Sequence, residues 1–251
     1  MSTAGIDSSD LDFSGKRVLI TGAASGIGNA IAHAFNAHGA TLLLADINPD
    51  GLDRAAQQLP GSTAFIYDQS DAASISMLAQ ATGQVDVLMN NAGILCVGPI
   101  LDATAADADR VIRTNLIGPM QLILAIAPGM VSRGHGVIVN TASQLAFTGS
   151  ATRAIYASAK AGLVQFTKAV AAELAPQGVR VVAIGPGRTR TPLTAHLLSD
   201  EKELAQSLRR IPAGRIGEAE EIARLALLLA SPLADYIVGE TLIADGGYIL
   251  E

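Results

Sequence analysis

Short apolar runs alternate with helix-like segments along almost the whole chain, and this alternation constrains the fold more than any other feature. The strand-like runs cover residues 17–21, 41–46, 64–67, 85–90, 136–142, 179–184 and 241–244. The helix-like segments between them cover residues 28–39, 50–59, 71–82, 102–132, 152–175 and 218–230. Strands that alternate with helices form a parallel sheet through right-handed crossovers. The pattern therefore predicts a doubly wound α/β fold, with a mainly parallel seven-stranded sheet and helices on both faces.

Length and composition agree with a single domain of this kind. The chain has 251 residues, of which 49% are hydrophobic and only 16% are charged. A sheet that helices bury on both faces needs such an excess of apolar residues. No repeat or linker interrupts residues 14–251, which we assign to one domain. Residues 1–13 are polar and acidic and predict a flexible N-terminal arm, without the basic start and apolar centre of a signal peptide.

Charge and cysteine content argue against several kinds of partner. The net charge is −6 and no basic stripe is visible, so nucleic acid is not an expected partner. A single cysteine, Cys96, cannot form an intramolecular disulfide, which fits a reducing cytoplasm. The uncharged stretch 114–132 contains Asn115, Gln121 and two prolines, and predicts a buried helix rather than a membrane span. The histidines show no metal-ligand spacing. We expect a cytoplasmic protein without a membrane anchor or a metal.

A glycine-rich turn follows the first strand-like run. It reads "TGAASGIG" over residues 21–28, with glycines at 22, 26 and 28. Glycines in this place permit a tight turn and let a diphosphate approach the first N–H groups of the next helix. A plain turn between strand and helix remains the alternative interpretation.

Asp46 ends the second strand-like run, 24 residues after Gly22. A carboxylate there can accept hydrogen bonds from both hydroxyls of an adenosine ribose, and it would repel a 2′-phosphate. Ser25 occupies the turn where a basic residue could have helped to bind that phosphate, and no arginine follows Asp46 directly. These residues favour NAD over NADP, although a turn or helix-capping aspartate is the simpler alternative.

Tyr156 and Lys160 are four residues apart in the helix-like segment 152–175 and therefore share one helix face. A free phenol has a pKa of about 10, so proton transfer near pH 7 requires about 4 kcal/mol of preference for the anion. A neighbouring ammonium could supply much of that in a sheltered cleft, but not on a wet surface. Ser143 could hold a substrate oxygen or be an ordinary loop serine. Asn115 lies in an apolar helix and needs a buried partner or a bound water.

Together these residues resemble the short-chain dehydrogenase/reductase family, whose fold is of Rossmann type. The resemblance rests on "TGAASGIG", Asp68, "NNAG" (90–93), Asn115, Ser143, "YASAK" (156–160), "PGRTRT" (186–191) and "ADGGY" (244–248). These motifs occur in the family's order, and the likeness covers about residues 14–248.

The resemblance implies a role for each matched residue. It implies cofactor contacts from Gly22, Ser25, Gly26, Ile27, Gly28 and Asp46 at the diphosphate and ribose, Asp68 and Gln69 at the adenine, Asn90 and Gly93 beside the ribose, Pro186, Gly187, Thr189 and Thr191 at the nicotinamide, and Tyr156 and Lys160 at the reacting end. It implies that Ser143, Tyr156 and Lys160 are catalytic, and that Asn115 anchors a proton-relay water.

Three segments are expected to line the substrate pocket: 94–98, 144–147 and a loop over about 188–215. The first two are mainly apolar, and the loop carries Leu193, Leu197 and Leu198 at helical spacing. An apolar lid predicts an apolar alcohol or ketone as the substrate. The chain departs from the family at Gly185, where asparagine is common, and at Arg188 and Arg190, which could meet an acidic substrate group or face solvent.

The resulting hypothesis is an NAD(H)-dependent enzyme that interconverts a secondary alcohol and a ketone. One alternative is a reductase of carrier-bound 3-oxoacyl chains, for which Arg188, Arg190, Arg209 and Arg210 could form a basic docking patch. Another is a non-catalytic dinucleotide-binding module. The segments 102–132 and 152–175 carry more apolar and small residues than one buried face needs, and family members pair such helices, so we expect a homotetramer.

Overall fold

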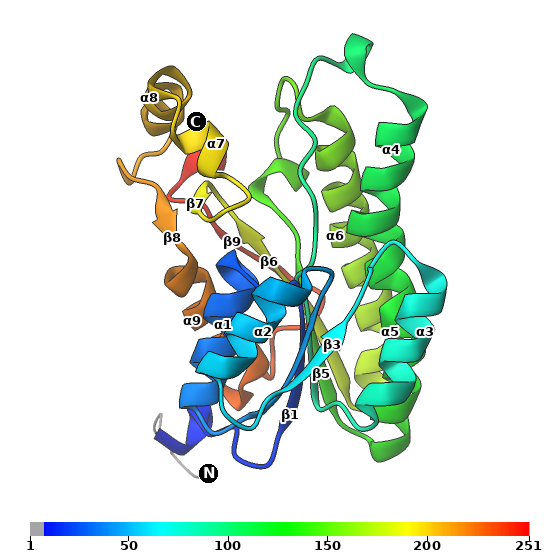
Figure 1. Ribbon diagram of the computed structural model, residues 1–251. Coiled ribbons are helices and arrows are strands. Elements are labelled where there is room, and N and C mark those ends of the chain that lie inside the picture. The colour runs from blue at the N-terminus through cyan, green and yellow to red at the C-terminus, as the bar shows by residue number, and fades with distance from the viewer. Residues whose placement is uncertain (1–7, 251) are drawn as a thin grey trace.

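The computed structural model describes residues 8–250, and these residues surround a seven-stranded sheet in which every neighbouring pair of strands is parallel (Figure 1). In spatial order the strands are β3 (Thr63–Ile66), β2 (Thr41–Asp46), β1 (Arg17–Thr21), β4 (Val87–Asn90), β5 (Gly136–Thr141), β6 (Val179–Pro186) and β9 (Thr241–Ala244). The predicted doubly wound fold is confirmed.

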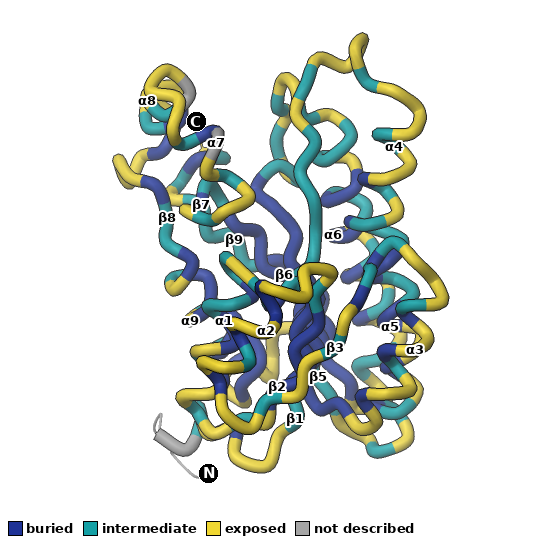
Figure 2. The backbone as a smooth tube through the Cα atoms, viewed as in Figure 1, coloured by how far each residue is buried: buried dark blue, intermediate teal, exposed yellow. Residues whose placement is uncertain are grey.

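The five central strands, β2, β1, β4, β5 and β6, contribute side chains to two hydrophobic cores, because successive side chains point to opposite faces of a sheet. In β1, Val18 and Ile20 join one core and Leu19 joins the other. The first core is covered by α1 (Gly26–Ala37), α2 (Pro49–Gln58) and α9 (Ala219–Ala230). The second is covered by α3 (Ala72–Thr82), α5 (Gly118–Arg133) and α6 (Ala154–Leu174). Figure 2 shows the central strands buried and the outer helix faces exposed.

The strand order reverses between β1 and β4, and ligands of open α/β sheets bind at such a reversal, outside the carboxyl ends of the strands. The loops that leave those ends carry the residues expected to act: the glycine turn after β1, Asp46 at the end of β2, Asp68 after β3, residues 91–94 after β4, Ser143 after β5 and residues 187–191 after β6. The topology therefore brings segments that are far apart in sequence to one edge of the sheet.

The single helix expected over residues 102–132 is divided in the structure. A 3₁₀ turn, η2 (Ile100–Asp102), is followed by α4 (Ala105–Ile112), a π-helical stretch, η3 (Arg113–Ile117), and then α5. Thr104 begins α4 through reciprocal hydrogen bonds with Asp107. By length and composition alone, the helical stretch Ala105–Arg133 could cross a membrane. In this fold its α5 portion buries Leu122 and Met130 against the sheet.

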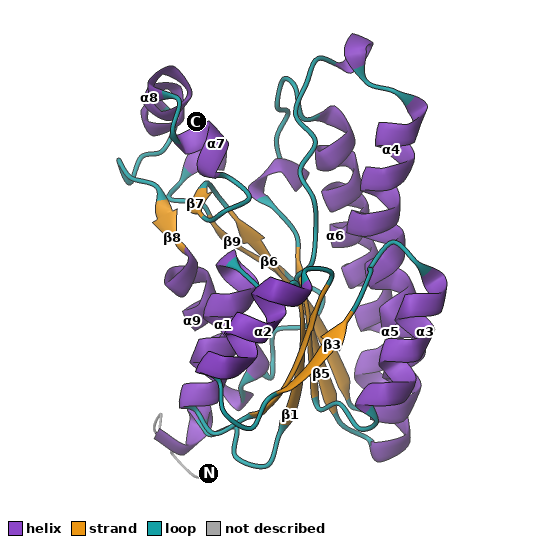
Figure 3. Cartoon of the chain, viewed as in Figure 1, coloured by secondary structure: helices purple, strands orange, loops and turns teal. Residues whose placement is uncertain are grey.

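The expected substrate loop contains structure that short sequence patterns do not reveal. After β6, the two-residue strands β7 (Thr189–Arg190) and β8 (Gly217–Glu218) pair with each other. Between them lie α7 (Ala195–Leu198) and α8 (Glu201–Arg209), which Figure 3 shows above the carboxyl ends of the strands. Strands of two residues are too short to show an alternating pattern.

The N-terminal arm ends before residue 13. Residues 1–7 of the predicted arm lie outside the described residues, and Ser8–Leu11 form a 3₁₀ turn, η1. Phe13 is buried, and its ring meets that of Phe35 edge-on at a centroid distance of 4.8 Å. Its backbone N–H donates to the carbonyl oxygen of His38 at 2.8 Å. Phe13 therefore belongs to the domain, because burial of an aromatic ring outweighs the polar character of the residues before it.

Candidate active site

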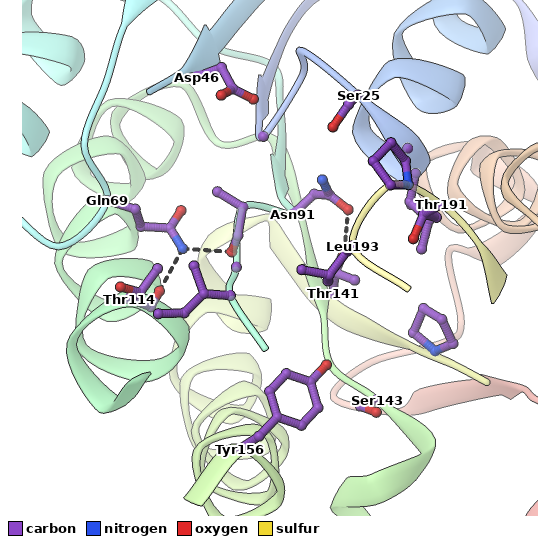
Figure 4. Close-up of a pocket in the computed structure, with 18 of the residues that line it drawn as sticks. Ser25, Asp46, Gln69, Asn91, Thr114, Thr141, Ser143, Tyr156, Thr191 and Leu193 are labelled. Carbon is purple, nitrogen blue, oxygen red and sulfur yellow. Dashed lines mark hydrogen bonds between the residues drawn. The ribbon is translucent and has the colours of Figure 1, made fainter. Parts of the chain in front are cut away.

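A cleft of about 590 Å³ opens at the reversal of strand order (Figure 4). Asp46 and Ser25 lie at one end, and Tyr156 and Ser143 lie at the other. The cleft is lined by most of the expected residues, namely Gly22, Ser25, Gly26, Ile27, Asp46, Asp68, Gln69, Gly93, Ser143, Tyr156, Lys160, Pro186, Gly187, Thr189 and Thr191. Three expected residues, Gly28, Asn90 and Asn115, are not in its wall. A cavity of this size is in the range of cofactor sites.

The glycine turn forms an open cradle at the start of α1. Gly22 and Gly26 have φ values of 69° and 55°, which residues with a β-carbon rarely adopt. Ser25 is the N-cap of α1, and its side chain makes no capping hydrogen bond. The first N–H groups of α1 are therefore available to an anion at the positive end of the helix dipole. A dinucleotide diphosphate fits this cradle.

Gly28 acts through packing rather than through the cleft. A β-carbon at this position would collide with the carbonyl oxygen of Gly22 and would lie 2.6 Å from Nδ2 of Asn91. Only glycine allows α1 to approach the preceding turn this closely. Gly28 thereby fixes the shape of the cradle that Gly22 and Gly26 line.

Asp46 is held in place at the other end of the cleft. Its Oδ2 accepts from the N–H of Ala24 at 2.9 Å, and its Oδ1 accepts from the N–H of Asn48 at 2.9 Å. The helix-capping role that was the alternative for Asp46 belongs to Asn48, whose side chain accepts from the N–H of Gly51. The carboxylate therefore ties the glycine turn to β2 while lining the cleft.

Asp68 and Gln69 follow β3 and contribute differently. Asp68 lines the cleft, and its Oδ1 accepts from both the N–H and the hydroxyl of Ser70, at 2.8 and 2.7 Å. Gln69 is buried, and its Nε2 donates to the carbonyl oxygens of Ala92 and Thr114 at 2.8 and 2.7 Å. Gln69 thus braces the loop after β4 against the π-helical turn, a function that its position in the sequence did not indicate.

The two asparagines of "NNAG" face opposite ways. Asn90 is buried and donates from Nδ2 to Oδ1 of Asn140 and to the carbonyl oxygen of Pro119, both at 3.2 Å. Asn91 lines the cleft, where its Nδ2 donates to the carbonyl oxygen of Thr21 at 3.1 Å and its Oδ1 accepts from the Thr141 hydroxyl at 3.3 Å. The sequence analysis named Asn90 and missed Asn91, although the alternation of side chains along a strand separates the two.

The side-chain amide of Asn115 forms hydrogen bonds with the backbone of Ile94 through both its oxygen and its nitrogen. Its Oδ1 accepts from the N–H of Ile94 at 2.9 Å, and its Nδ2 donates to the carbonyl oxygen of Ile94 at 2.8 Å. The side chain is fully buried within the π-helical stretch η3, a local form that is common at functional sites. Its side chain therefore fixes the loop that forms one wall of the cleft.

Lys160 and Tyr156 meet on one face of α6, as their spacing predicts. The Lys160 side chain is 4% exposed, and its Nζ donates to the carbonyl oxygen of Thr141 at 2.6 Å. The same nitrogen lies 5.9 Å from the centre of the Tyr156 ring. Ser143 is also buried, and its hydroxyl accepts from the N–H of Leu145 at 3.2 Å. Both Tyr156 and Ser143 line the same end of the cleft (Figure 4).

Burial is the main cause of the pKa shifts of Lys160 and Tyr156. It lowers the pKa of Lys160 to about 8, because a charged ammonium loses its water there. It also raises the pKa of Tyr156, and a hydrogen bond with Ser143 opposes that rise without cancelling it. The lowered phenol pKa that the sequence predicts is therefore not produced by the protein's own groups. They keep the phenol neutral and place a mostly protonated lysine beside it.

The arginines considered for a basic docking patch have different surroundings. Arg190 is 63% exposed at its side chain and pairs with Glu218 at 3.3 Å. Arg210 lies over the ring of Tyr248, 4.2 Å from its centre. Arg188 lines a small cavity beside Ser143 and Tyr156. Among the side chains that the structure describes, no three of His, Cys, Asp or Glu gather as metal ligands, and Cys96 lines a separate cavity next to α4.

Comparisons with known proteins agree with this geometry. A family model described as enoyl-(acyl carrier protein) reductase matches residues 22–249. A 3-oxoacyl-[acyl-carrier-protein] reductase from Thermotoga maritima is 38% identical over 244 residues, which cover 94% of this chain and 98% of that protein. A D-threitol dehydrogenase from Mycolicibacterium smegmatis is 38% identical over 252 residues, which cover 96% of each chain.

Solved structures show the same fold with a dinucleotide in it. A candidate NAD(P)-dependent gluconate 5-dehydrogenase from Beutenbergia cavernae, with NADP bound at low occupancy, superposes with a TM-score of 0.91 at 35% identity, covering 96% of this chain and 100% of that one. The names of these relatives give different substrates, so they identify the family of this chain but not its substrate. The chain belongs to the short-chain dehydrogenase/reductase family of oxidoreductases, whose members bind a nicotinamide dinucleotide.

Proposed function

We propose that the protein is an NAD(H)-dependent oxidoreductase that interconverts a secondary alcohol and a ketone. The observation that carries this proposal is the buried Lys160 beside Tyr156, in the same cleft as the glycine cradle. Burying a charged ammonium costs free energy. Such a group next to a phenol in a cleft is typical of a functional site. Asn115, Ser143, Tyr156 and Lys160 are the proposed catalytic residues.

The nicotinamide ring supplies or accepts the hydride when the cofactor is bound. The Ser143 hydroxyl holds the substrate oxygen, and the Tyr156 hydroxyl gives a proton to that oxygen in ketone reduction or takes one in alcohol oxidation. A neutral phenol is the form that reduction requires. Lys160, whose pKa is about 8, remains mostly protonated at pH 7 and favours the phenolate that oxidation requires.

Proton exchange with solvent needs a path from the buried lysine. A β-carbon at Gly93 would lie 2.9 Å from Oδ1 of Asn115 and 3.6 Å from Nζ of Lys160. Glycine at position 93 therefore lets this backbone lie close to both residues, because a β-carbon would crowd Oδ1 of Asn115. We place the relay water that Asn115 anchors in this region, in contact with Lys160.

The proposed cofactor is NAD rather than NADP. Asp46 is fixed at the end of β2 by two backbone hydrogen bonds, so its charge cannot turn away from a bound ribose. A 2′-phosphate would meet that charge, whereas two ribose hydroxyls can donate to it. NADP is bound at low occupancy in the Beutenbergia cavernae structure, so the fold itself does not exclude NADP, and we assign the choice of cofactor in this chain to Asp46.

The proposed substrate is a small molecule with an apolar part. Leu95, Leu145, Leu193 and Leu197 line the small cavity that adjoins Ser143 and Tyr156, and Leu197 belongs to α7. A carrier-bound 3-oxoacyl chain is the second candidate, favoured by the Thermotoga maritima relative. The pairing of Arg190 with Glu218 weakens the proposed basic docking patch. Turnover of 3-oxoacyl thioesters with NADPH in preference to NADH would support the second candidate.

We further propose a homotetramer in the cytoplasm. Leu124, on the outer side of α5, is 71% exposed, whereas the other side of this helix is buried against the sheet. Pairing of α5 and α6 between subunits would cover this surface. A mass of one or two subunits by light scattering at micromolar concentration would contradict the tetramer.

The experiment that tests the function is a screen of secondary alcohols and ketones with NAD(H), repeated with Tyr156→Phe. The exchange should lower kcat by about 10²- to 10⁴-fold, because the proton has no donor or acceptor, and should leave the dissociation constant of NADH almost unchanged. A non-catalytic module would bind NADH and show the same negligible turnover before and after the exchange.

A further inference from the structure

Gln144 is a buried polar residue in the substrate cavity, and no role described so far explains it. It begins the 3₁₀ turn η4 (Gln144–Ala146), directly after Ser143, and it is 4% exposed. Its Oε1 is buried and has no hydrogen-bond partner. A buried amide oxygen without a partner is costly, and a leucine of similar size would avoid the cost.

The surroundings of Gln144 point to a ligand. The residue lines a cavity of about 80 Å³ together with Ser143, Tyr156, Leu193 and Tyr248. A β-carbon at Gly187, which lines the same cavity, would lie 2.8 Å from Oε1 of Gln144. Gly187 also lines the main cleft. The amide therefore lies between the end of the cleft that holds the substrate oxygen and the segment expected at the nicotinamide.

We propose that Gln144 is a specificity-determining residue that binds a second oxygen of the substrate, on the carbon next to the reacting carbon. This inference rests on the proposed function. Ser143 and Gln144 line the same small cavity, so the two substrate oxygens that they bind can lie on neighbouring carbon atoms. A hydroxyl both donates and accepts, and it can satisfy either end of an amide.

The substrate class that follows is a compact vicinal diol and its hydroxy ketone. The cavity is small, at about 80 Å³, and shares Ser143, Tyr156 and Gly187 with the main cleft, which favours a compact substrate that can extend into that cleft. In the oxidation, the hydroxyl proton would pass to the phenolate of Tyr156 while the C–H bond of the reacting carbon breaks, and bound NAD would accept the hydride. The second hydroxyl, on Gln144, is unchanged. The leucines of the cavity contact the remaining carbon atoms.

The test compares matched substrates with and without the second oxygen. The full-length protein is assayed with NAD on 2,3-butanediol against 2-butanol and on 1,2-cyclohexanediol against cyclohexanol, and with NADH on acetoin against butanone. We expect kcat/KM to favour the oxygen-bearing member of each pair by at least about 10-fold. Gln144→Leu should lower kcat/KM for that member by about 10- to 100-fold, because the second oxygen of the substrate then has no hydrogen-bond partner in the cavity. For the partner substrates the change should stay within about threefold.

Two further variants guard against a merely structural effect. Gln144→Glu keeps the size of the side chain and removes the amide nitrogen. It should also lower kcat/KM for the oxygen-bearing member of each pair while leaving the other member almost unchanged. Leu145→Met, in the same wall, should change both members of a pair alike. Equal losses for both members in the Gln144 variants, or no loss at all, would overturn the inference. If the wild-type protein turns over both members of each pair equally, the inference about Gln144 is overturned and the proposed function stands. If the protein binds NADH but is inactive on every pair, the proposed function is overturned as well.

Discussion

The ammonium nitrogen of Lys160 lies 2.6 Å from the carbonyl oxygen of Thr141, at the carboxyl end of β5. This hydrogen bond holds a buried cation beside the ring of Tyr156. The fall of the lysine pKa from 10.5 to about 8 corresponds to a cost of about 3 kcal/mol for the charged form. The site therefore contains a charged group whose burial lowers the stability of the folded protein.

Lys160→Met should therefore stabilise the cofactor-free protein while abolishing activity. The folded pKa lies below the unfolded value of about 10.4, so the unfolded chain binds more protons between about pH 8 and pH 10. Wild-type stability should rise with pH across this window, and the full cost is present below pH 8. At pH 7, we expect the exchange to raise Tm by about 2 to 6 °C. In the variant, the rise above pH 8 should be smaller.

Differential scanning calorimetry from pH 6.5 to 10 measures both effects. Lys168→Met is the matched control, because Lys168 is an exposed lysine on the same helix. It should change Tm by much less. A lower Tm for Lys160→Met at pH 7 would mean that the bond to Thr141 outweighs the desolvation of the charge.

Asp46→Asn should reduce the preference for NAD over NADP by about 10-fold or more. The amide oxygen can still accept from a backbone N–H, but the charge that repels a 2′-phosphate is gone. The measurement is the ratio of kcat/KM for the two cofactors at one substrate concentration. Asp50→Asn, an exposed position on α2, provides the control. An unchanged ratio for Asp46→Asn would show that this carboxylate does not face the ribose.

Asn115→Leu should lower the free energy of unfolding by about 2 to 4 kcal/mol. The exchange leaves the N–H and the carbonyl oxygen of Ile94 without their buried partners. Because Leu95 follows in the cavity wall, KM for the substrate should rise together with the fall in kcat. Urea unfolding and steady-state kinetics measure these effects. Ser132→Ala, on the exposed side of α5, should stay within about 0.5 kcal/mol of the wild type, and equal stability of the Asn115 variant would refute the bracing role.

Arg180→Met should destabilise the protein by about 2 to 4 kcal/mol without changing kcat. The buried guanidinium donates to the carbonyl oxygens of Leu229 and Ser231 at the end of α9. Its loss leaves both carbonyls unsatisfied. Arg180 lies near the amino end of β6, at the opposite edge of the sheet from the cleft. Urea unfolding and activity assays separate the two effects, with the exposed Arg113→Met as control; a comparable loss of kcat would contradict this separation.

The strands and the chemical residues could be predicted from the sequence because both have local signals. β1, β2 and β9 have the predicted bounds, and the other strands differ by one or two residues at an end. The i, i+4 spacing of Tyr156 and Lys160 predicts their common helix face, and the structure brings them together. Local periodicity suffices wherever a residue's neighbours in space are also its neighbours along the helix or strand.

The remaining features depend on contacts between distant segments. Gln69 carries no local sign of its bonds to Ala92 and Thr114, which belong to two other loops. The π-helical turn at Asn115 interrupts a pattern that reads as one continuous helix. The raised pKa of Tyr156 follows from burial, which no spacing of residues reports. The first two features come from packing, and the third from the loss of water that packing causes.

Gly28 also limits how the cofactor site can change in evolution or by design. No positive φ is required there, so its backbone would accept any amino acid, and the restriction comes entirely from the carbonyl of Gly22 and the amide of Asn91. A saturation library at position 28 would accordingly return only glycine. Adaptation to a different dinucleotide therefore has to proceed through the residues that follow β2, while the diphosphate cradle is inherited unchanged.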